Sequence, residues 1–133
     1  MGRFLVARAE VGVVFTLYSE TGRVLVSSKP YATLDACKKA ICSLVRYAVD
    51  CPVVPKGEGR HPNPKFVLSE AELGVCCEML APNGKSVVVL GPFATKKACL
   101  RAVSMLRTGV RSATVELEQG GCRIPLRLGN LPQ

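Results

Sequence analysis

Short apolar runs and one longer stretch of helical periodicity follow each other twice along the chain. Apolar runs of strand length predict strands, and apolar residues three or four positions apart predict helices at 34–48 and 95–111. The predicted strands are 3–7, 13–19, 24–28 and 51–54 in the first half, and 65–69, 75–81, 86–90 and 113–117 in the second. The pattern therefore predicts the order βββαβ in each half.

Each predicted helix follows a threonine and has one apolar face. Thr33 and Thr95 are suited to cap the helix N-termini, because a threonine hydroxyl accepts from the free backbone N–H groups there. Thr21-Gly22 and Asn83-Gly84 predict tight hairpin turns, because Asn and Gly tolerate a positive φ. The apolar faces comprise Cys37, Ala40, Ile41, Leu44, Val45 and Ala48 in the first helix, and Cys99, Ala102, Val103, Leu106 and Val110 in the second.

The two halves align without a gap at an offset of 62 residues. Fourteen of the 46 residues at 3–48 are identical to their counterparts at 65–110, which indicates one structural unit present twice. We predict a first repeat at 1–54, a Pro- and Gly-rich linker at 55–64, a second repeat at 65–118 and a tail at 119–133. Together they would form one pseudo-twofold domain, in which the tail has too little periodicity to be placed.

Length and composition are typical of one soluble domain. The chain has 133 residues, 48% of them hydrophobic, which suffices for a core and excludes a coiled coil or a collagen-like chain. No apolar run approaches the roughly 18 residues that a membrane span needs. Only four apolar residues precede Arg8 at the start, too few for a secretory signal. We expect a cytoplasmic protein without membrane contact.

Several residues of the repeat resemble the YegP-like family, a domain of unknown function that occurs singly or in tandem. The similarity lies in the x-Gly turns, the aromatic residue before the helix and an Ile-x-Ser-(Val/Leu)-x-(Lys/Arg) pattern late in it. The matching residues are Gly2-Arg3-Phe4, Phe15-Thr16-Leu17, Thr21-Gly22-Arg23-Val24, Tyr31 and Ile41-Cys42-Ser43-Leu44-Val45-Arg46-Tyr47-Ala48, then Lys65-Phe66, Asn83-Gly84-Lys85, Phe93 and Val103-Ser104-Met105-Leu106-Arg107. The resemblance covers about 110 of the 133 residues.

The resemblance implies an α+β fold in which two tandem βββαβ repeats share one antiparallel sheet. Both helices would lie on one face, with the C-terminal strands exchanged between repeats. The chain departs from the family at Lys39-Ala40 and Arg101-Ala102, where members usually carry a small polar pair, and at Cys76-Cys77. The family supplies no catalytic residues to carry over.

The seven cysteines are best interpreted as small buried hydrophobic residues. Their number is odd, no Cys-x-x-Cys occurs, and His61 is the single histidine, so neither a disulfide framework nor a zinc site is favoured. Metal or redox chemistry is the less favoured alternative. Cys51 and Cys122 lie in loop-like segments, where we expect the most exposed thiols.

No constellation of residues indicates catalysis. The ten acidic residues lie mostly at turns or on the solvent side of strands, and His61 lies in the linker. Gly57-Glu58-Gly59 and Gly120-Gly121 lack the strand or the helix that a phosphate-binding loop requires. We therefore predict a protein that is not an enzyme and that uses no cofactor or metal.

Most of the formal charge of +8 lies on the two predicted helices. The helix at 34–48 carries three cations and one acid, and the helix at 95–111 carries five cations and no acid. Such a basic layer attracts polyanions by counterion release without reading sequence. The alternatives are a solvated surface and compensation of the helix dipoles. The candidate residues for binding nucleic acid or another polyanion are Lys38, Lys39, Arg46, Lys97, Arg101, Arg107 and Arg111.

The sheet face opposite the helices is the main candidate for an interface. If both helices cover one face, the other is left open, and an exposed apolar face usually marks a binding surface. The candidate interface residues are Cys76, Leu80, Val87 and Val89. We predict a homodimer or a protein partner at this face, with weak nucleic-acid binding at the helices as the alternative function. A tail folded back through Ile124, Leu126, Leu128 and Leu131 would cover the face instead.

Overall fold

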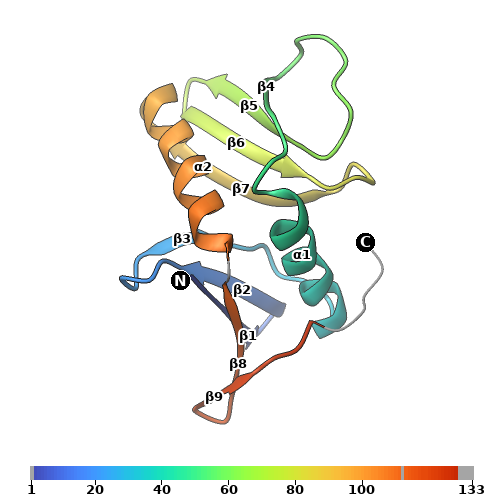
Figure 1. The fold of residues 1–133 in the computed structure, drawn as a ribbon, viewed down its shortest axis with the longest axis vertical. Coiled ribbons are helices and arrows are strands. Elements are labelled where there is room, and N and C mark those ends of the chain that lie inside the picture. Colours follow the sequence, from blue (N-terminus) through green and yellow to red (C-terminus); the bar gives the residue numbers. More distant parts are fainter. Residues whose placement is uncertain (1, 112, 129–133) are drawn as a thin grey trace.

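The computed structural model describes residues 2–111 and 113–128, whose helices and strands are labelled in Figure 1. The first half contains β1 (Arg3–Ala9), β2 (Gly12–Tyr18), β3 (Val24–Ser27), α1 (Leu34–Tyr47) and β4 (Val53–Pro55). The second half contains β5 (Lys65–Ala71), β6 (Gly74–Leu80), β7 (Ser86–Phe93), α2 (Lys96–Val110), β8 (Thr114–Gln119) and β9 (Cys122–Pro125). The fold is thus mixed α+β, and the order βββαβ occurs twice before β9.

The strands form two sheets, and the expected single antiparallel sheet is wrong. One sheet has the order β3-β2-β1-β8-β9 and the other has the order β4-β5-β6-β7. The edge strands β3 and β7 are neighbours, but no described residues pair them into one ladder. Each edge has a register shift beside it, at Leu17/Tyr18 and at Met79/Leu80. Because such bulges bend and twist a strand, the two edges do not continue one sheet.

The last strand of each βββαβ unit pairs with the other unit. β8 lies parallel to β1, with Val115 opposite Phe4, and β4 lies parallel to β5, with Val53 opposite Phe66. This is the strand exchange that the family resemblance implied, and it introduces two parallel pairs into sheets that are otherwise antiparallel. Each sheet therefore contains strands from both halves of the chain.

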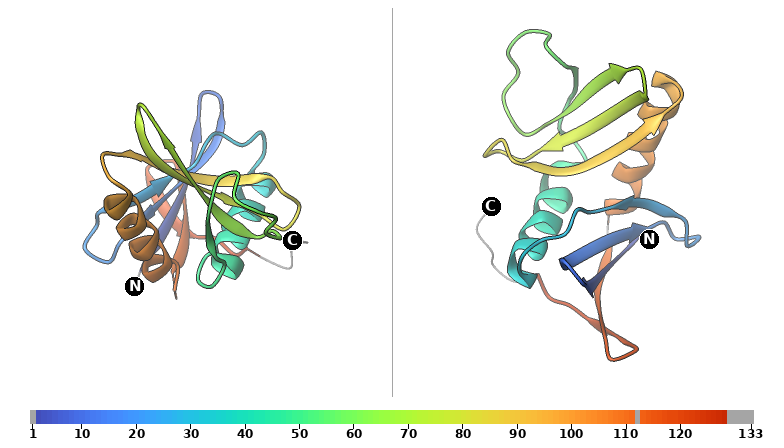
Figure 2. Two further views of the ribbon diagram at one scale, coloured as in Figure 1. Left: turned by 90° about the horizontal axis from the view of Figure 1, so that it is seen from above. Right: turned by 180° about the vertical axis from the view of Figure 1, so that it is seen from behind.

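Both helices lie on the same side of the two sheets (Figure 2). α1 contacts β2 and β7, and α2 contacts β2, β3, β6 and β7, so each helix packs against both sheets. Neither of these helices has the length and apolar character needed to cross a membrane. The largest fully buried side chains of the shared core are Phe4, Phe15, Phe66, Leu17, Ile41, Leu44, Met79 and Leu106.

The threonine caps predicted from the sequence are confirmed. The hydroxyl of Thr33 accepts from the backbone N–H of Ala36, and that of Thr95 accepts from Ala98, each at 3.1 Å. Each satisfies one of the backbone donors that a helix start leaves free. The helices therefore begin within one residue of their predicted starts.

One residue predicted on a buried helix face is exposed. Val45 is 41% exposed, whereas Cys37, Ala40, Ile41 and Leu44 of the same helix are buried. Val45 lies at the margin of the stripe that these four residues form, where the sheets no longer cover the helix. The buried stripe of α1 is therefore narrower than the apolar periodicity suggested.

Gly12 and Gly74 begin β2 and β6 and lie against the backbone of Tyr31, after β3, and of Phe93, the last residue of β7. Their φ values are +141° and +132°. A Cβ on Gly12 would lie 2.3 Å from the carbonyl oxygen of Tyr31, and one on Gly74 would lie 2.7 Å from that of Phe93. No side chain fits so close an approach of two backbone segments. This explains why glycine recurs here in both halves.

Replacing Gly12 by alanine is expected to lower the free energy of unfolding by about 3 kcal/mol, because the added Cβ meets a backbone oxygen and the φ is strained. Gly120→Ala is the matched control, since its φ is also positive (+59°) but no atom lies within 4 Å of the added Cβ. The control should lose about 1 kcal/mol. Urea unfolding followed by circular dichroism measures both, and equal losses would contradict the steric explanation.

Candidate interaction surfaces

The outer face of the second sheet, turned away from the helices, carries a row of mostly aliphatic side chains. Val54, Val67, Glu78 and Val89 lie opposite one another on β4, β5, β6 and β7. Val54 is buried and Val67 and Glu78 are partly exposed, whereas Val89 is 49% exposed. The row therefore brings apolar surface to the solvent at the β7 end.

The equivalent row of the first sheet is mostly polar. At the equivalent positions of β8, β1, β2 and β3 lie Glu116, Leu5, Thr16 and Ser27. Arg3 Nε lies 3.5 Å from a carboxylate oxygen of Glu116, and the Arg3 guanidinium lies 5.2 Å from the centre of the Tyr18 ring. The two outer faces therefore differ in chemistry, although their strands pair in the same registers.

Three of the four predicted interface residues reach the outer face of the second sheet. Cys76 and Leu80 are partly exposed there, on either side of Glu78, and Val89 is the most exposed of the set. Val87 is 4% exposed and belongs to the core, so its predicted position is wrong. The register shift beside Leu80 leaves Val87 without a cross-strand partner, and a residue in a bulge no longer follows the alternation of its strand.

The described part of the C-terminal tail does not cover this face. β9 pairs with β8 at the far edge of the first sheet, and the chain then runs toward the start of α1 (Figure 1). Leu126 and Leu128 pack against the core, and Ile124 is 40% exposed. Leu131 lies outside the described residues. The alternative of a tail folded over the second sheet thus finds no support in the described tail.

The predicted polyanion-binding residues lie on the side of the helices, and most are exposed. Within the described residues, one ion pair joins Arg3 to Glu116 and none involves a helix cation. Lys96 and Lys97 occupy the first turn of α2, which contains no acid. Lys38 and Arg107 are partly buried, and the exposed members are Lys39, Arg46, Lys97, Arg101 and Arg111.

Arg107 differs from the other helix cations because its guanidinium binds within the molecule. Its Nε donates to the carbonyl oxygen of Ala48 at 3.0 Å, and its Nη2 donates to that of Cys51. The guanidinium carbon lies 5.5 Å from the centre of the Phe66 ring. The end of a helix leaves its last carbonyl groups without partners. Arg107 of α2 therefore caps the C-terminal end of α1, a contact that helical periodicity alone did not reveal.

The cysteines are mostly buried thiols. Cys37, Cys51, Cys77 and Cys99 are buried and Cys122 is exposed, so the expected exposure of Cys51 is wrong. Its segment closes the end of α1 onto the core, where Arg107 binds its carbonyl group. Burial raises the pKa of the Cys37 and Cys77 thiols to about 12, which keeps them protonated at neutral pH. No three His, Cys, Asp or Glu side chains of the described ranges are grouped as metal ligands.

Two adjoining hollows lie beside the β2–β3 turn, one between that turn and the starts of β1 and β8, the other between the turn and the C-terminal half of α2. The larger, of about 420 Å³, is lined by Gly2, Arg3, Ser19, Glu20, Thr21, Gly22 and Thr114. The smaller, of about 270 Å³, is lined by Gly2, Ser19, Glu20, Leu25, Ser104, Met105, Thr108 and Gly109. The linings offer hydroxyl groups, the carboxylate of Glu20 and the guanidinium of Arg3, but no histidine or cysteine that could act as a base or nucleophile. The outer sheet face and the helix cations thus remain the most developed candidate sites.

Two exposed turn residues were not predicted as surface features. Val11, between β1 and β2, is 76% exposed, and Leu73, between β5 and β6, is 91% exposed. Each follows a glutamate, Glu10 or Glu72, that is identical in the two halves. This identity in a turn, where neither strand pairing nor the core requires a glutamate, is the signal in the sequence that could have identified them.

Two solved structures with this fold are similar to the chain. The protein of unknown function yegP from E. coli matches with a TM-score of 0.70 and 18% identity, over 90% of this chain and 94% of that one. A UPF0339 protein from Shewanella oneidensis matches with a TM-score of 0.68 and 14% identity, over 87% and 90% of the two chains. No family model and no curated protein matches. The two structural matches confirm the resemblance to YegP-like proteins in fold, but not the single shared sheet that the resemblance implied.

Arg107→Leu is expected to lower the free energy of unfolding by about 2 kcal/mol, because the carbonyl groups of Ala48 and Cys51 lose a charged donor. Arg101→Leu, the matched control, removes an exposed cation from the same helix and should change it by less than about 0.5 kcal/mol. Guanidinium unfolding measures both. A loss in the control as large as that in Arg107→Leu would contradict the capping role.

Proposed function

We propose that the protein is a non-enzymatic interaction module that binds a folded protein through the outer face of its second sheet. The observation that carries the proposal is the row Val54, Val67, Glu78 and Val89, which is aliphatic at three of its four positions. The first sheet holds one aliphatic residue, Leu5, in the same registers. The fold therefore does not require the aliphatic row, and a function that uses it explains its presence.

A partner that covered the outer face of the second sheet would remove apolar surface from water. Complete burial of a valine-sized side chain contributes about 1.5–3 kcal/mol, and Val89 leaves 49% of its surface in water. Leu80 and Cys76 extend the apolar surface along β6, and both are partly exposed. The helices lie on the other side of the sheet (Figure 2), so a partner can approach without displacing them.

A second copy of the chain is the first partner to test. Most soluble oligomers are homo-oligomers, and twofold contacts, in which the same patch meets itself, are the commonest among them. An aliphatic row with a single acid at Glu78 suits such a contact, because few charges would be removed from water. A different protein would be bound through the same side chains.

Val89→Lys is expected to weaken self-association at least about tenfold, because it brings a charge into the aliphatic row. Ser27→Lys is the matched control, since Ser27 occupies the equivalent position of the first sheet. Sedimentation equilibrium over a range of protein concentrations measures both variants against the wild type. A monomeric wild type, or association that Val89→Lys leaves intact, would refute self-association through this face.

The exposed cations of α2, for which the described residues show no ion pair, favour a second candidate function, the binding of nucleic acid or another polyanion. A cation in the first turn of a helix opposes the helix dipole by about 0.3–1 kcal/mol. Lys96 and Lys97 both lie there, without an acid in that turn, so they are not placed for helix stability. Arg101 and Arg111 continue the exposed positive charge along the helix.

The wild type should bind a labelled DNA duplex at low salt and lose affinity at least about tenfold between about 50 and 200 mM salt. The double variant Lys97→Glu/Arg101→Glu should abolish this binding. Lys56→Glu/Arg60→Glu, in the exposed linker, makes the same change of charge away from the helices and is the matched control. Fluorescence anisotropy measures all three proteins. Equal losses of affinity in the two double variants would show that net charge alone determines binding to the duplex. That result would contradict a binding site on α2.

A further inference from the structure

The turn between β5 and β6 carries the most exposed large hydrophobic side chain of the described residues. Leu73 is 91% exposed, and Glu70 and Glu72 beside it are exposed as well. Tight hairpin turns favour Gly, Asn and Asp, and the turns at Thr21-Gly22 and Asn83-Gly84 follow that preference. Neither the turn nor the core therefore explains a leucine at this position.

The equivalent turn of the first half has the same character. Val11 is 76% exposed and follows Glu10, as Leu73 follows Glu72. Within the described ranges, neither of these glutamates takes part in an ion pair. An acid followed by an exposed aliphatic residue thus occurs in both turns, although neither strand pairing nor core packing requires it.

The two hairpins differ in charge. Residues 66–84 contain Glu70, Glu72 and Glu78 and no Lys or Arg, in a chain whose formal charge is +8. In the first hairpin, Arg8 lies two residues before Glu10 and balances it. Glu70, Glu72 and Leu73, which we name the β5–β6 tip, therefore form an acidic and apolar projection on a basic protein.

The N-terminal half of α2 has the complementary composition. Leu100 is 38% exposed, and Lys96 and Lys97 lie one turn before it, on the same side of the helix. Arg101 follows and is exposed, as both lysines are. We name Lys96, Lys97, Leu100 and Arg101 the α2 patch. An aliphatic side chain among cations here matches an aliphatic side chain among acids at the tip.

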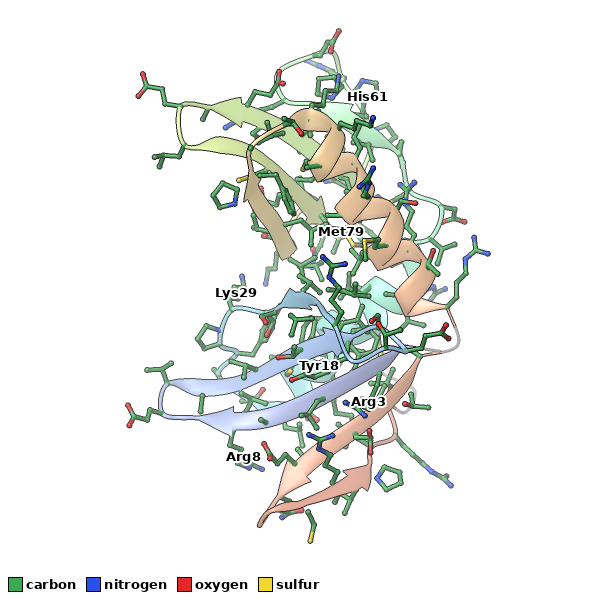
Figure 3. All side chains as sticks on the ribbon, turned by 90° about the vertical axis from the view of Figure 1, so that its left-hand side faces the viewer. Arg3, Arg8, Tyr18, Lys29, His61 and Met79 are labelled. Atoms are coloured by element: carbon green, nitrogen blue, oxygen red, sulfur yellow. The ribbon has the colours of Figure 1, made fainter. Side chains whose placement is uncertain are left out.

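The β5–β6 hairpin and α2 project to different sides of the sheets. In Figure 3 the β5–β6 hairpin projects to the left and α2 lies to the right of the sheets, and the left view of Figure 2 also places the hairpin away from the helices. Within the described residues no ion pair joins the tip to the patch of the same chain, so both are free to meet a second copy. A contact between them joins two copies and leaves one tip and one patch free for further copies.

We infer that the β5–β6 tip of one copy docks on the α2 patch of a second copy, so that the protein associates head to tail. Leu73 packs against Leu100, and the two glutamates of the tip face the three cations of the patch. One tip buries little surface, so the contact is weak, and its exposed charges make it sensitive to salt. This contact does not depend on the outer face of the second sheet.

Sedimentation equilibrium at low salt should show a weight-average mass that rises past that of a dimer as the protein concentration increases. Raising the salt from about 20 to 300 mM should lower the association constant at least about tenfold. Leu73→Ser and Glu72→Lys should each lower it by a similar factor, because each removes one part of the tip. Val11→Ser, in the charge-balanced first turn, is the matched control and should leave it within about twofold.

A charge exchange tests the two surfaces together. One variant carries Glu70→Lys and Glu72→Lys, and the other carries Lys97→Glu and Arg101→Glu, all at exposed positions. Each variant alone should be monomeric, because its tip and its patch then have the same sign of charge. An equal mixture should associate again, since the reversed tip of one fits the reversed patch of the other. Circular dichroism checks that both variants are folded.

A wild type that stays monomeric at about 1 mM protein and low salt overturns the inference. Association that Leu73→Ser leaves unchanged, or a mixture of the two charge variants that fails to associate, overturns it as well. Association that is insensitive to salt and lost in Val89→Lys would belong to the outer sheet face. That result would support the proposed function while refuting the head-to-tail contact, so the two can fail separately.

Discussion

The parallel pairs β1–β8 and β4–β5 hold the molecule together, because they place the last strand of each βββαβ unit beside the first strand of the other. Arg3 lies opposite Thr114 in one pair and Phe66 lies opposite Val53 in the other. Neither half can complete its sheet alone. Both helices then pack across the two sheets, and Arg107 of α2 binds the carbonyl groups at the end of α1. Because these contacts join distant parts of the chain, we expect the two halves to fold as one cooperative unit.

A shared core leaves the two surfaces free to differ. Several core positions keep the same residue in both halves, as Phe4 and Phe66 or Leu44 and Leu106 do, and the others stay apolar, as Ile41 and Val103 do. At the surface, Ser27 corresponds to Val89 on the outer sheet face, and Lys38 corresponds to Leu100 on the helix side. Both differences put an aliphatic residue on the surface of the second half. The two halves of the chain therefore do not present equivalent surfaces, although their strands pair in the same registers.

Most helices and strands could be predicted because their signals act over a few residues. Thr33 and Thr95 cap their helices by accepting from the backbone N–H three residues later. The alternation of side chains along a strand predicted that Leu80 and Val89 lie on the outer face. The division into two sheets could not be predicted, because it depends on edge strands that are distant in the sequence and on bulges that periodicity does not reveal. The same bulge removed Val87 from the predicted interface. The capping role of Arg107 requires knowing that α2 passes the end of α1, which no local pattern encodes.

The net charge of +8 describes the interactions of this protein less well than the separation of its charges does. Cations lie along the helix side, whereas the charged residues of 66–84 are all acids, and the β5–β6 hairpin projects to the other side of the sheets (Figure 3). At physiological ionic strength the Debye length is about 8 Å, so attraction between neighbouring patches outweighs the repulsion of whole molecules. The cations of α2 that would hold the β5–β6 tip of a second copy are also those that would hold a polyanion. The two uses therefore exclude each other, and a polyanion bound along α2 should separate copies that are joined head to tail.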